Sequence, residues 1–268
     1  MTQKKGISGV IITFNEEANI RRCITSLLDV VDEVVVVDSN STDNTVAICE
    51  ELNARVVLQP FLGFIEQKNF ALDCAKYHYV LSLDADEALS EELRASILEV
   101  KSNWKNDSYF FNRFNNYCGQ WIYHSNWYPD RKLRLFDRRK AKWGGTNPHD
   151  RIILNEGASK NYLEGNLLHW VLPTYEAHID KANKFSTIAA KEAFKRGKKA
   201  SILTILSHAF WRFFNSYFLK LGILDGYNGF VICSLSSFTV FLKYIKLRQL
   251  NLAEKSELTE KSSRQNHA

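Results

Sequence analysis

Two carboxylates spaced at i and i+2 are the strongest sign of chemistry in this sequence. They lie in Asp84-Ala85-Asp86-Glu87, directly after an apolar run over residues 79–83 that predicts a buried strand. Carboxylates at the end of a parallel strand can approach one ligand together. Their oxygens suit Mn²⁺ or Mg²⁺, with a diphosphate and water in the remaining positions, and such an ion would neutralise charge on a departing nucleoside diphosphate. The alternative is a turn followed by helix-capping acids.

Polar segments also follow the first two predicted strands. Thr13-Phe14-Asn15-Glu16-Glu17 comes after the first, and the second is followed by Asp38-Ser39-Asn40-Ser41-Thr42-Asp43. A dinucleotide-binding turn would carry glycines after the first strand, but residues 10–62 contain none, which disfavours a nicotinamide or flavin enzyme. These polar side chains can instead contact a base and ribose. A capped turn is the alternative, and for Asp43 it is the favoured one.

The elements that position these residues alternate between strand and helix. We expect strands at residues 10–14, 34–38, 55–58 and 79–83, with helices over 18–28, up to 52, over 66–76 and from 91 onward. This order predicts an α/β fold with a doubly wound, mainly parallel sheet, in which ligands lie at the carboxyl ends of the strands.

The rest of the chain changes character twice. Residues 109–169 predict a meander of short aromatic strands, and residues 175–196 an amphipathic helix. The most apolar run, residues 229–242, is shorter than the roughly 20 residues of a spanning helix, so an interfacial or re-entrant element is expected. We therefore expect an α/β, ligand-binding domain at 1–172, a helical, membrane-associating region at 173–250 and a polar, disordered tail at 251–268.

Composition indicates which partners and which cellular compartment to expect for the protein. The excess of 35 basic over 30 acidic residues is too small to indicate a nucleic-acid partner. Five scattered cysteines without metal spacing fit reduced thiols in a cytosolic protein. No apolar leader follows the N-terminal Met1, so we expect the catalytic part to be cytoplasmic.

Taken together, the three polar segments resemble glycosyltransferase family 2, of the GT-A superfamily. That family shows T-x-N-E-E, D-x-S-x-D-x-T and D-x-D segments in this order, and Gln67-Lys68-Asn69 also resembles a family segment. Further along, Arg134-Leu135-Phe136, Pro148-His149-Asp150 and Leu224-Asp225-Gly226 resemble the branch of lipopolysaccharide-core beta-glucosyltransferases. That branch has His-Glu where this chain has His149-Asp150, so the carboxylate is kept but shortened.

The resemblance implies an inverting transfer of a hexose from a nucleoside-diphosphate sugar, with UDP favoured, and a role for each matching residue. Asp150 is the expected catalytic base; the alternative is a surface ion pair with Arg151 or Arg134. Asp86 is the expected metal ligand, and His169 either completes the metal sphere or is a core histidine. The expected donor-binding residues are Thr13, Phe14, Asn15, Glu16, Asp38, Lys68, Asp84, Ala85 and Arg134.

Partners follow from the resemblance and from the C-terminal third. An aromatic run over residues 210–218 is flanked by lysines and arginines, as in segments that lie on an anionic membrane surface. A homodimer interface would also be apolar and aromatic. A glycolipid or saccharide acceptor favours the membrane, with the protein peripheral on the inner face of the cytoplasmic membrane. Transfer to a polyprenyl phosphate, and a catalytically silent nucleotide-binding or assembly domain, are the alternatives.

Overall fold

The computed structural model describes residues 6–146 and 149–265, which form two compact units. The sheet unit comprises Met1–Asn115 and Pro129–Val171, and the helical unit comprises Asn116–Tyr128 and Leu172–Ala268. The expected division at residue 172 lies within one residue of this boundary. The segment Asn116–Tyr128 differs from expectation, because it belongs to the helical unit although it lies within the predicted first domain.

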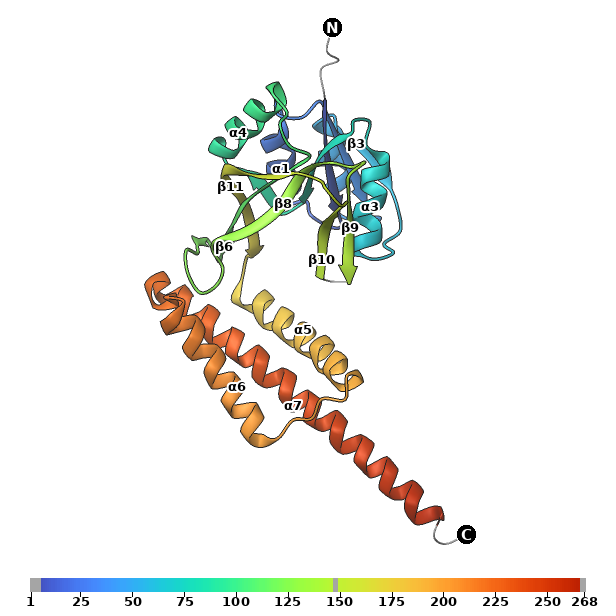
Figure 1. Cartoon of the computed structure of the whole chain (residues 1–268), viewed down its shortest axis with the longest axis vertical. Helices are drawn as coiled ribbons and strands as arrows, with labels where there is room; N and C mark the ends of the chain where they lie inside the picture. The colour runs from blue at the N-terminus through green and yellow to red at the C-terminus, as the bar shows by residue number, and fades with distance from the viewer. Residues whose placement is uncertain (1–5, 147–148, 266–268) are drawn as a thin grey trace. The chain divides into compact units, whose positions relative to one another are not determined.

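The first half of the sheet unit has the predicted alternation of strands and helices (Figure 1). Its four strands lie parallel in the order β3-β2-β1-β4. The strands are β1 (Ile7–Thr13), β2 (Glu33–Asp38), β3 (Arg55–Leu58) and β4 (Tyr79–Asp84); the helices are α1 (Ile20–Leu27), α2 (Thr45–Glu51), α3 (Phe64–Cys74) and α4 (Glu91–Ser102). Ser90 caps α4 as expected, since its hydroxyl accepts the Leu93 N–H at 3.2 Å.

Side chains of these strands alternate between two apolar cores, one on each face of the sheet. In β2, Val36 packs into the core that contains residues of α1, α2 and α4, whereas Val35 packs into the core that contains residues of α3. In β4, Leu81 and Val80 divide in the same way. This is the period of two that a strand buried on both faces requires. Helices therefore cover both faces, as the doubly wound prediction states.

The second half of the sheet is antiparallel. It continues from β4 through β8, β6 and β11 to β5, and a separate β9–β10 hairpin lies beside it (Figure 1). The strands are β5 (Glu87–Leu89), β6 (Ser108–Tyr117), β7 (Gln120–Trp121), β8 (Asp130–Asp137), β9 (Ala141–Thr146), β10 (His149–Leu154) and β11 (Lys160–Leu172). Strands β6 and β11 are 10 and 13 residues long, so they are longer than the short strands that the sequence predicted.

Gly165 in β11 allows the sheet to pack closely against α4. Its φ is +95°, and a Cβ at this position would lie 2.3 Å from the Leu93 nitrogen. We expect Gly165→Ala to destabilise the fold by about 3 kcal/mol, because it combines backbone strain with a backbone clash. Gly157→Ala is the matched control, since Gly157 also has a positive φ, +76°, but open space around it. Equal shifts of the two variants in urea unfolding would show that the contact with α4 is unimportant.

The helical unit contains α5 (Tyr175–Lys195), α6 (Ile202–Phe214) and α7 (Gly226–Gln265). Both α5 and α6 pack against α7. A π-helical turn (Asn215–Leu219) and a 3₁₀ turn (Gly222–Asp225) connect α6 to α7.

Asp225 ties the segment Asn116–Tyr128 to this unit. Its buried carboxylate accepts the backbone N–H groups of Tyr123 at 3.1 Å and His124 at 3.0 Å, and the Ser125 hydroxyl at 3.3 Å. The Leu224-Asp225-Gly226 segment therefore stabilises the conformation of residues 123–125.

Helix α7 differs from expectation at both of its ends. It continues through the polar segment from Asn251 as far as Gln265, where composition had favoured disorder; residues 266–268 lie outside the described part. Among the described residues, one helical segment, Gly222–Ser256, is long and apolar enough to cross a membrane by length and composition, and 17% of its most apolar window is buried. The prediction of an interfacial element used only the apolar run over residues 229–242. The helical segment extends beyond that run in both directions. A single such helix is weak support for a span.

Candidate active site

The loops after β1 and β2 hold each other in place. Asn15 has a φ of +54°, which asparagine tolerates, and its N–H donates to the Ser41 hydroxyl at 2.8 Å. In return the Asn15 side-chain oxygen accepts the Thr42 N–H at 2.8 Å. The backbone N–H of Glu16 donates to the Thr45 hydroxyl at 2.8 Å. The two loops thus form one ordered edge at the carboxyl ends of the strands.

The expected donor residues on this edge differ in what they offer to a ligand. Thr13 is buried, and its hydroxyl has no hydrogen-bond partner in the described part of the chain. The Phe14 ring is 55% exposed. Asp38 is fully buried and accepts the Ser41 N–H at 2.8 Å, so its carboxylate holds the turn.

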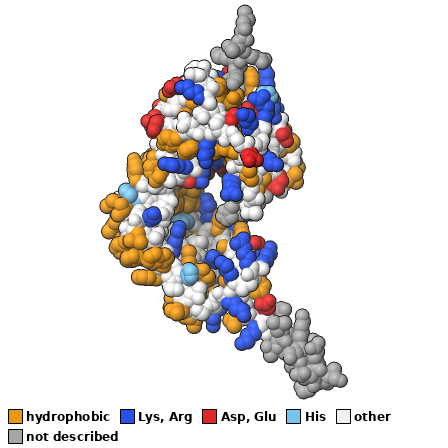
Figure 2. Space-filling model, viewed as in Figure 1, with side chains coloured by type: hydrophobic (Ala, Val, Ile, Leu, Met, Phe, Trp, Pro, Cys, Tyr) orange, Lys and Arg blue, Asp and Glu red, His pale blue; other side chains and the backbone are white. Residues whose placement is uncertain are grey.

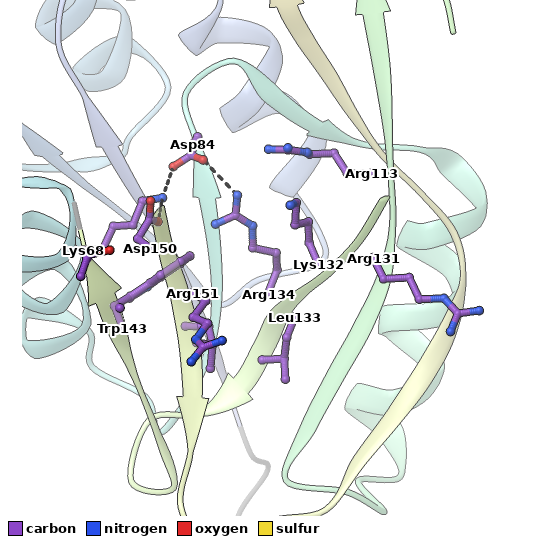
Figure 3. A pocket seen from close by; sticks show the side chains of 13 residues that line it. Lys68, Asp84, Arg113, Arg131, Lys132, Leu133, Arg134, Trp143, Asp150 and Arg151 are labelled. Carbon is purple, nitrogen blue, oxygen red and sulfur yellow. Dashed lines mark hydrogen bonds and ion pairs between the residues drawn. The ribbon is translucent and has the colours of Figure 1, made fainter. Parts of the chain in front are cut away.

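Asp84 lies at the centre of a network of charges (Figure 3). Its carboxylate contacts Lys68 Nζ at 2.9 Å and a terminal guanidinium nitrogen of Arg134 at 2.9 Å. Burial alone would raise the pKa of Asp84, but the charges of Lys68 and Arg134 outweigh it and hold that pKa well below its usual range. Asp84 is therefore a carboxylate at every physiological pH. Ala85 is buried in the apolar core, so only its backbone can contact a ligand.

A β-bulge directs Arg134 into this network. Tyr109 and Phe110 of β6 pair with Leu135 and Leu133 of β8, which leaves Arg134 without a partner residue across the pair. Its buried guanidinium contacts Glu87 Oε1 at 2.9 Å as well as Asp84, and Glu87 is fully buried. Burial opposes the charge of Arg134, but the two carboxylates overcome this effect and raise its pKa.

Arg134→Met removes the main counter-charge of a buried carboxylate. Among the described residues, the ion pair left to Glu87 would be the longer contact with Arg113, at 3.4 Å. We expect a loss of about 3 kcal/mol in the free energy of unfolding, because breaking one side of a buried ion pair leaves the other charge uncompensated. Arg21→Met is the control, since Arg21 and Glu51 form an ion pair with exposed side chains, and its urea midpoint should not change. A midpoint for Arg134→Met equal to that of the wild type would contradict this role.

Asp86 and His169, the two expected metal ligands, lie against each other. His169 Nε2 is 3.2 Å from Asp86 Oδ2, and Nδ1 is 2.6 Å from the Asn115 side-chain oxygen. In the neutral ring, Nδ1–H donates to Asn115, so the Nε2 lone pair faces the carboxylate. A divalent ion bound by both atoms would stabilise this arrangement, and a proton on Nε2, which makes an ordinary ion pair, is the alternative. The pair therefore fits a divalent ion with nitrogen and oxygen ligands.

The chain supplies only part of such a coordination sphere. In residues 6–146 and 149–265, no group of three or more His, Cys, Asp and Glu side chains is placed to hold a metal ion. Glu16 lies near the pair: its pKa is raised, first by burial and then by the charges of Asp86, Asp43 and Asp84. A cation would relieve this repulsion, with its remaining positions left to a ligand.

Asp150 joins the same network through Lys68. Its Oδ2 is 2.8 Å from Lys68 Nζ, so one buried ammonium bridges Asp150 and Asp84. The alternative of a surface pair with Arg151 or Arg134 is wrong for the described contacts, because the half-buried Asp150 pairs with Lys68. The Trp143 ring lies 4.3 Å from Lys68 Nζ and limits where the ammonium can move. The side chain of His149 lies outside the described residues.

A pocket of about 1010 Å³ opens beside this network, within the sheet unit. Asp84, Lys68, Arg134 and Asp150 line it (Figure 3). The other lining residues are Arg113, Arg131, Lys132, Leu133, Trp143, Gly145, Thr146, Arg151 and Ile152.

Several residues of the site were not predicted. Glu87 was part of the acidic segment, but nothing in its spacing indicated that it would be the buried partner of Arg134. Asn115, which orients His169, has no signal in a single sequence. Arg113 and Lys132 flank Asp130 at 2.9 Å each, and the pairing of β6 with β8 is what brings Arg113 to this strand.

The fold and this carboxylate site define a GT-A-type transferase, and comparison with known proteins agrees. The model of the family Glycosyl transferase family 2 matches residues 8–165. The chain therefore belongs to glycosyl transferase family 2, as the sequence motifs indicated, and it is an enzyme that transfers sugars.

Two glycosyltransferases match nearly the whole chain, and a solved structure matches part of it. An uncharacterized glycosyltransferase of Rickettsia bellii is 37% identical over 262 residues, covering 92% of this chain and 88% of that protein. The lipopolysaccharide core biosynthesis glycosyltransferase LpsC of Rhizobium meliloti is 30% identical over 260 residues, covering 93% and 94%. Glucosyl-3-phosphoglycerate synthase of Mycobacterium tuberculosis, solved with Mn²⁺ and UDP, is similar to 42% of this chain and 44% of its own, with 27% identity and a TM-score of 0.35.

Proposed function

We propose that the protein is a metal-dependent, inverting hexosyltransferase that uses a UDP-sugar and a lipid-linked saccharide acceptor, such as a lipopolysaccharide core. The observation that carries the proposal is the bridge from Asp84 through Lys68 to Asp150, because it brings the candidate base and two expected donor-binding residues to one pocket. The 30% identity to LpsC supports the class of acceptor.

The donor would bind along the edge formed by the loops after β1 and β2. Thr13, Phe14 and Asn15 contact the nucleotide in this proposal, and Asp38 keeps their loop in shape. Asp86 and His169 hold Mn²⁺ or Mg²⁺, which when bound stabilises the charge of the leaving diphosphate. Lys68 and Arg134 add fixed positive charge beside Asp84, where the transferred sugar and its diphosphate meet.

The transfer forms a bond from the acceptor hydroxyl oxygen to the anomeric carbon while the bond from that carbon to the diphosphate breaks. Inversion requires attack from the face opposite the diphosphate, so the base lies across the sugar from the leaving group. Asp150 takes the proton of the attacking hydroxyl. The contact with Lys68 fixes the position of its carboxylate before the acceptor arrives.

Membrane association is proposed for the helical unit, through an α6 apolar face. This face consists of residues that are each more than half exposed and recur at helical spacing: Ile202, Leu203, Leu206, Phe210 and Trp211. Figure 2 shows apolar side chains gathered on this unit with lysines and arginines among them. Such a surface suits the boundary between acyl chains and anionic headgroups on the cytoplasmic side.

Replacing Phe210 and Trp211 with serine should lower binding to phosphatidylglycerol vesicles by about tenfold or more, because both rings lose apolar contact with the lipid. Co-sedimentation measures this loss. Phe61→Ser is the control, since Phe61 is 51% exposed but belongs to the sheet unit. Unchanged vesicle binding together with loss of a dimer in sedimentation would assign the α6 apolar face to a homodimer interface.

The transfer itself is tested with labelled UDP-glucose, UDP-galactose and GDP-mannose, incubated with the protein and bacterial membranes. We expect label from a UDP-sugar in an acid-stable glycolipid fraction. Label only in an acid-labile lipid phosphate would favour the polyprenyl-phosphate alternative. Nucleotide binding without transfer from any donor would favour a catalytically silent domain.

A further inference from the structure

The pocket beside Asp84 has an excess of positive charge. Two carboxylates line it, Asp84 and Asp150. Six cationic side chains line it as well: Lys68, Arg113, Arg131, Lys132, Arg134 and Arg151. The charge of the whole chain is only +5, so this concentration is a property of the pocket.

Four of these six cations are already paired. Lys68 contacts Asp84 and Asp150, and Arg134 contacts Asp84 and Glu87. Two carboxylates of the same network, Glu87 and Asp130, take up the remaining paired cations, which are Arg113 and Lys132.

Arg131 and Arg151 are the remaining two, and neither forms an ion pair with any carboxylate in the part of the chain that the structure describes. Both are exposed, and the Arg131 guanidinium lies 5.9 Å from the rings of Phe110 and Tyr162. Figure 3 shows Arg113 and Lys132 near Arg134 and Asp84, whereas Arg131 and Arg151 extend away from that cluster. The two cations without an ion-pair partner among the described residues, Arg131 and Arg151, therefore line the part of the pocket away from Asp84, which we call its outer walls.

These outer walls lie apart from the residues assigned to the donor nucleotide. Of the expected donor residues, Lys68, Asp84 and Arg134 line the inner part of the pocket together with the proposed base Asp150, whereas Thr13, Asp38, Asp86 and His169 do not line it. A ligand that extends outward from Asp150 therefore leaves the donor residues and enters the outer part of the pocket. Its outer part meets two arginines that can each form a bidentate contact with phosphate or carboxylate.

We propose that the pocket binds an acceptor saccharide that carries a negatively charged group, a phosphate or a carboxylate, and that Arg131 and Arg151 recognise it. This inference rests on the proposed function, since it assigns the pocket to the acceptor. A cationic pocket concentrates anionic ligands and discriminates against neutral ones of equal size. The attraction should weaken as salt is added.

The test uses full-length protein saturated with UDP and Mg²⁺, so that the donor site is filled. Glucose 6-phosphate, glucuronate and glucose are titrated separately by calorimetry. We expect at least one charged sugar to bind about tenfold more tightly than glucose, and the Arg131→Gln, Arg151→Gln double variant to lose most of this preference. Lys142→Gln is the matched control, because Lys142 is an exposed cation on β9 that does not line the pocket.

Three results would overturn the inference. The first is equal binding of charged and neutral sugars by the wild type. The second is a matching loss of UDP affinity in the double variant, which would assign the arginines to the donor diphosphate. The third is loss of binding to phosphatidylglycerol vesicles without any change in sugar binding, which would assign them to lipid headgroups. UDP binding by the wild type is measured before any sugar is added. Failure to bind UDP would count against the proposed function and not against this inference alone.

Discussion

Asp150→Asn should lower kcat for sugar transfer by about a hundredfold to ten-thousandfold and leave the affinity for the donor nucleotide unchanged. The carboxamide is nearly the same size as the carboxylate but cannot accept the proton of the acceptor hydroxyl, and loss of a general base has an effect of this size. Steady-state transfer from UDP-sugar, with nucleotide affinity measured in parallel, separates these two properties.

Two controls make this result specific. Asp150→Glu restores the longer side chain of the family branch and should retain much of the activity. The ammonium of Lys68 keeps its contact with Asp84 in both variants, so both should stay folded. Near-normal turnover of Asp150→Asn would exclude Asp150 as the base and leave it as a partner of Lys68.

Asp86→Ala should weaken Mn²⁺-dependent nucleotide binding by more than about a hundredfold. The variant removes the only carboxylate within ion-pair distance of His169 in the described residues, and loss of a ligand should cost more than the tenfold to hundredfold typical of a residue that merely orients one. Calorimetric titration of UDP with Mn²⁺ and with EDTA measures the metal-dependent part.

The control for this variant is Glu91→Ala, which removes an acid whose side chain is 94% exposed on α4. It changes the net charge equally and should not alter UDP affinity. If Asp86→Ala kept the full Mn²⁺-dependent affinity, Asp86 would not be a metal ligand, and the contact with His169 would be an ordinary ion pair.

The structure suggests why the network beside Asp84 contains so many charges. Removing charged groups from water is costly unless each is paired, and in this network Asp84, Asp150 and Glu87 each contact at least one cation. Lys68 and Arg134 therefore do two things at once. They neutralise the carboxylates in the absence of a ligand, and they provide fixed positive charge for a diphosphate when one is bound.

The parts that were predictable from the sequence depend on local patterns. The β-branched runs of β1 and β2 identify buried strands, Ser90 identifies the start of α4, and the polar residues after three strands must meet at one sheet edge. The family match supports the same assignment. These features follow from residues that are close in sequence, which is why a single chain reveals them.

The parts that were not predictable depend on contacts between distant residues. The bulge that directs Arg134 toward Glu87 arises from the pairing of β6 with β8, and neither strand encodes it alone. The segment Asn116–Tyr128 belongs to the helical unit because Asp225, about a hundred positions later, accepts its N–H groups. Helix α7 was underestimated because composition does not show that a polar segment continues an apolar helix.

The measurement that tests the central claim most directly is the thermal stability of the wild-type protein with UDP, GDP or ADP, each with Mn²⁺ or with EDTA. A ligand that binds only the folded state at a hundredfold excess over its Kd adds about 2.7 kcal/mol, which raises Tm measurably. We predict a higher Tm with UDP and Mn²⁺, and no such rise with UDP and EDTA. An unchanged Tm with all three nucleotides, in protein shown to be folded, would contradict a metal-dependent nucleotide-sugar site.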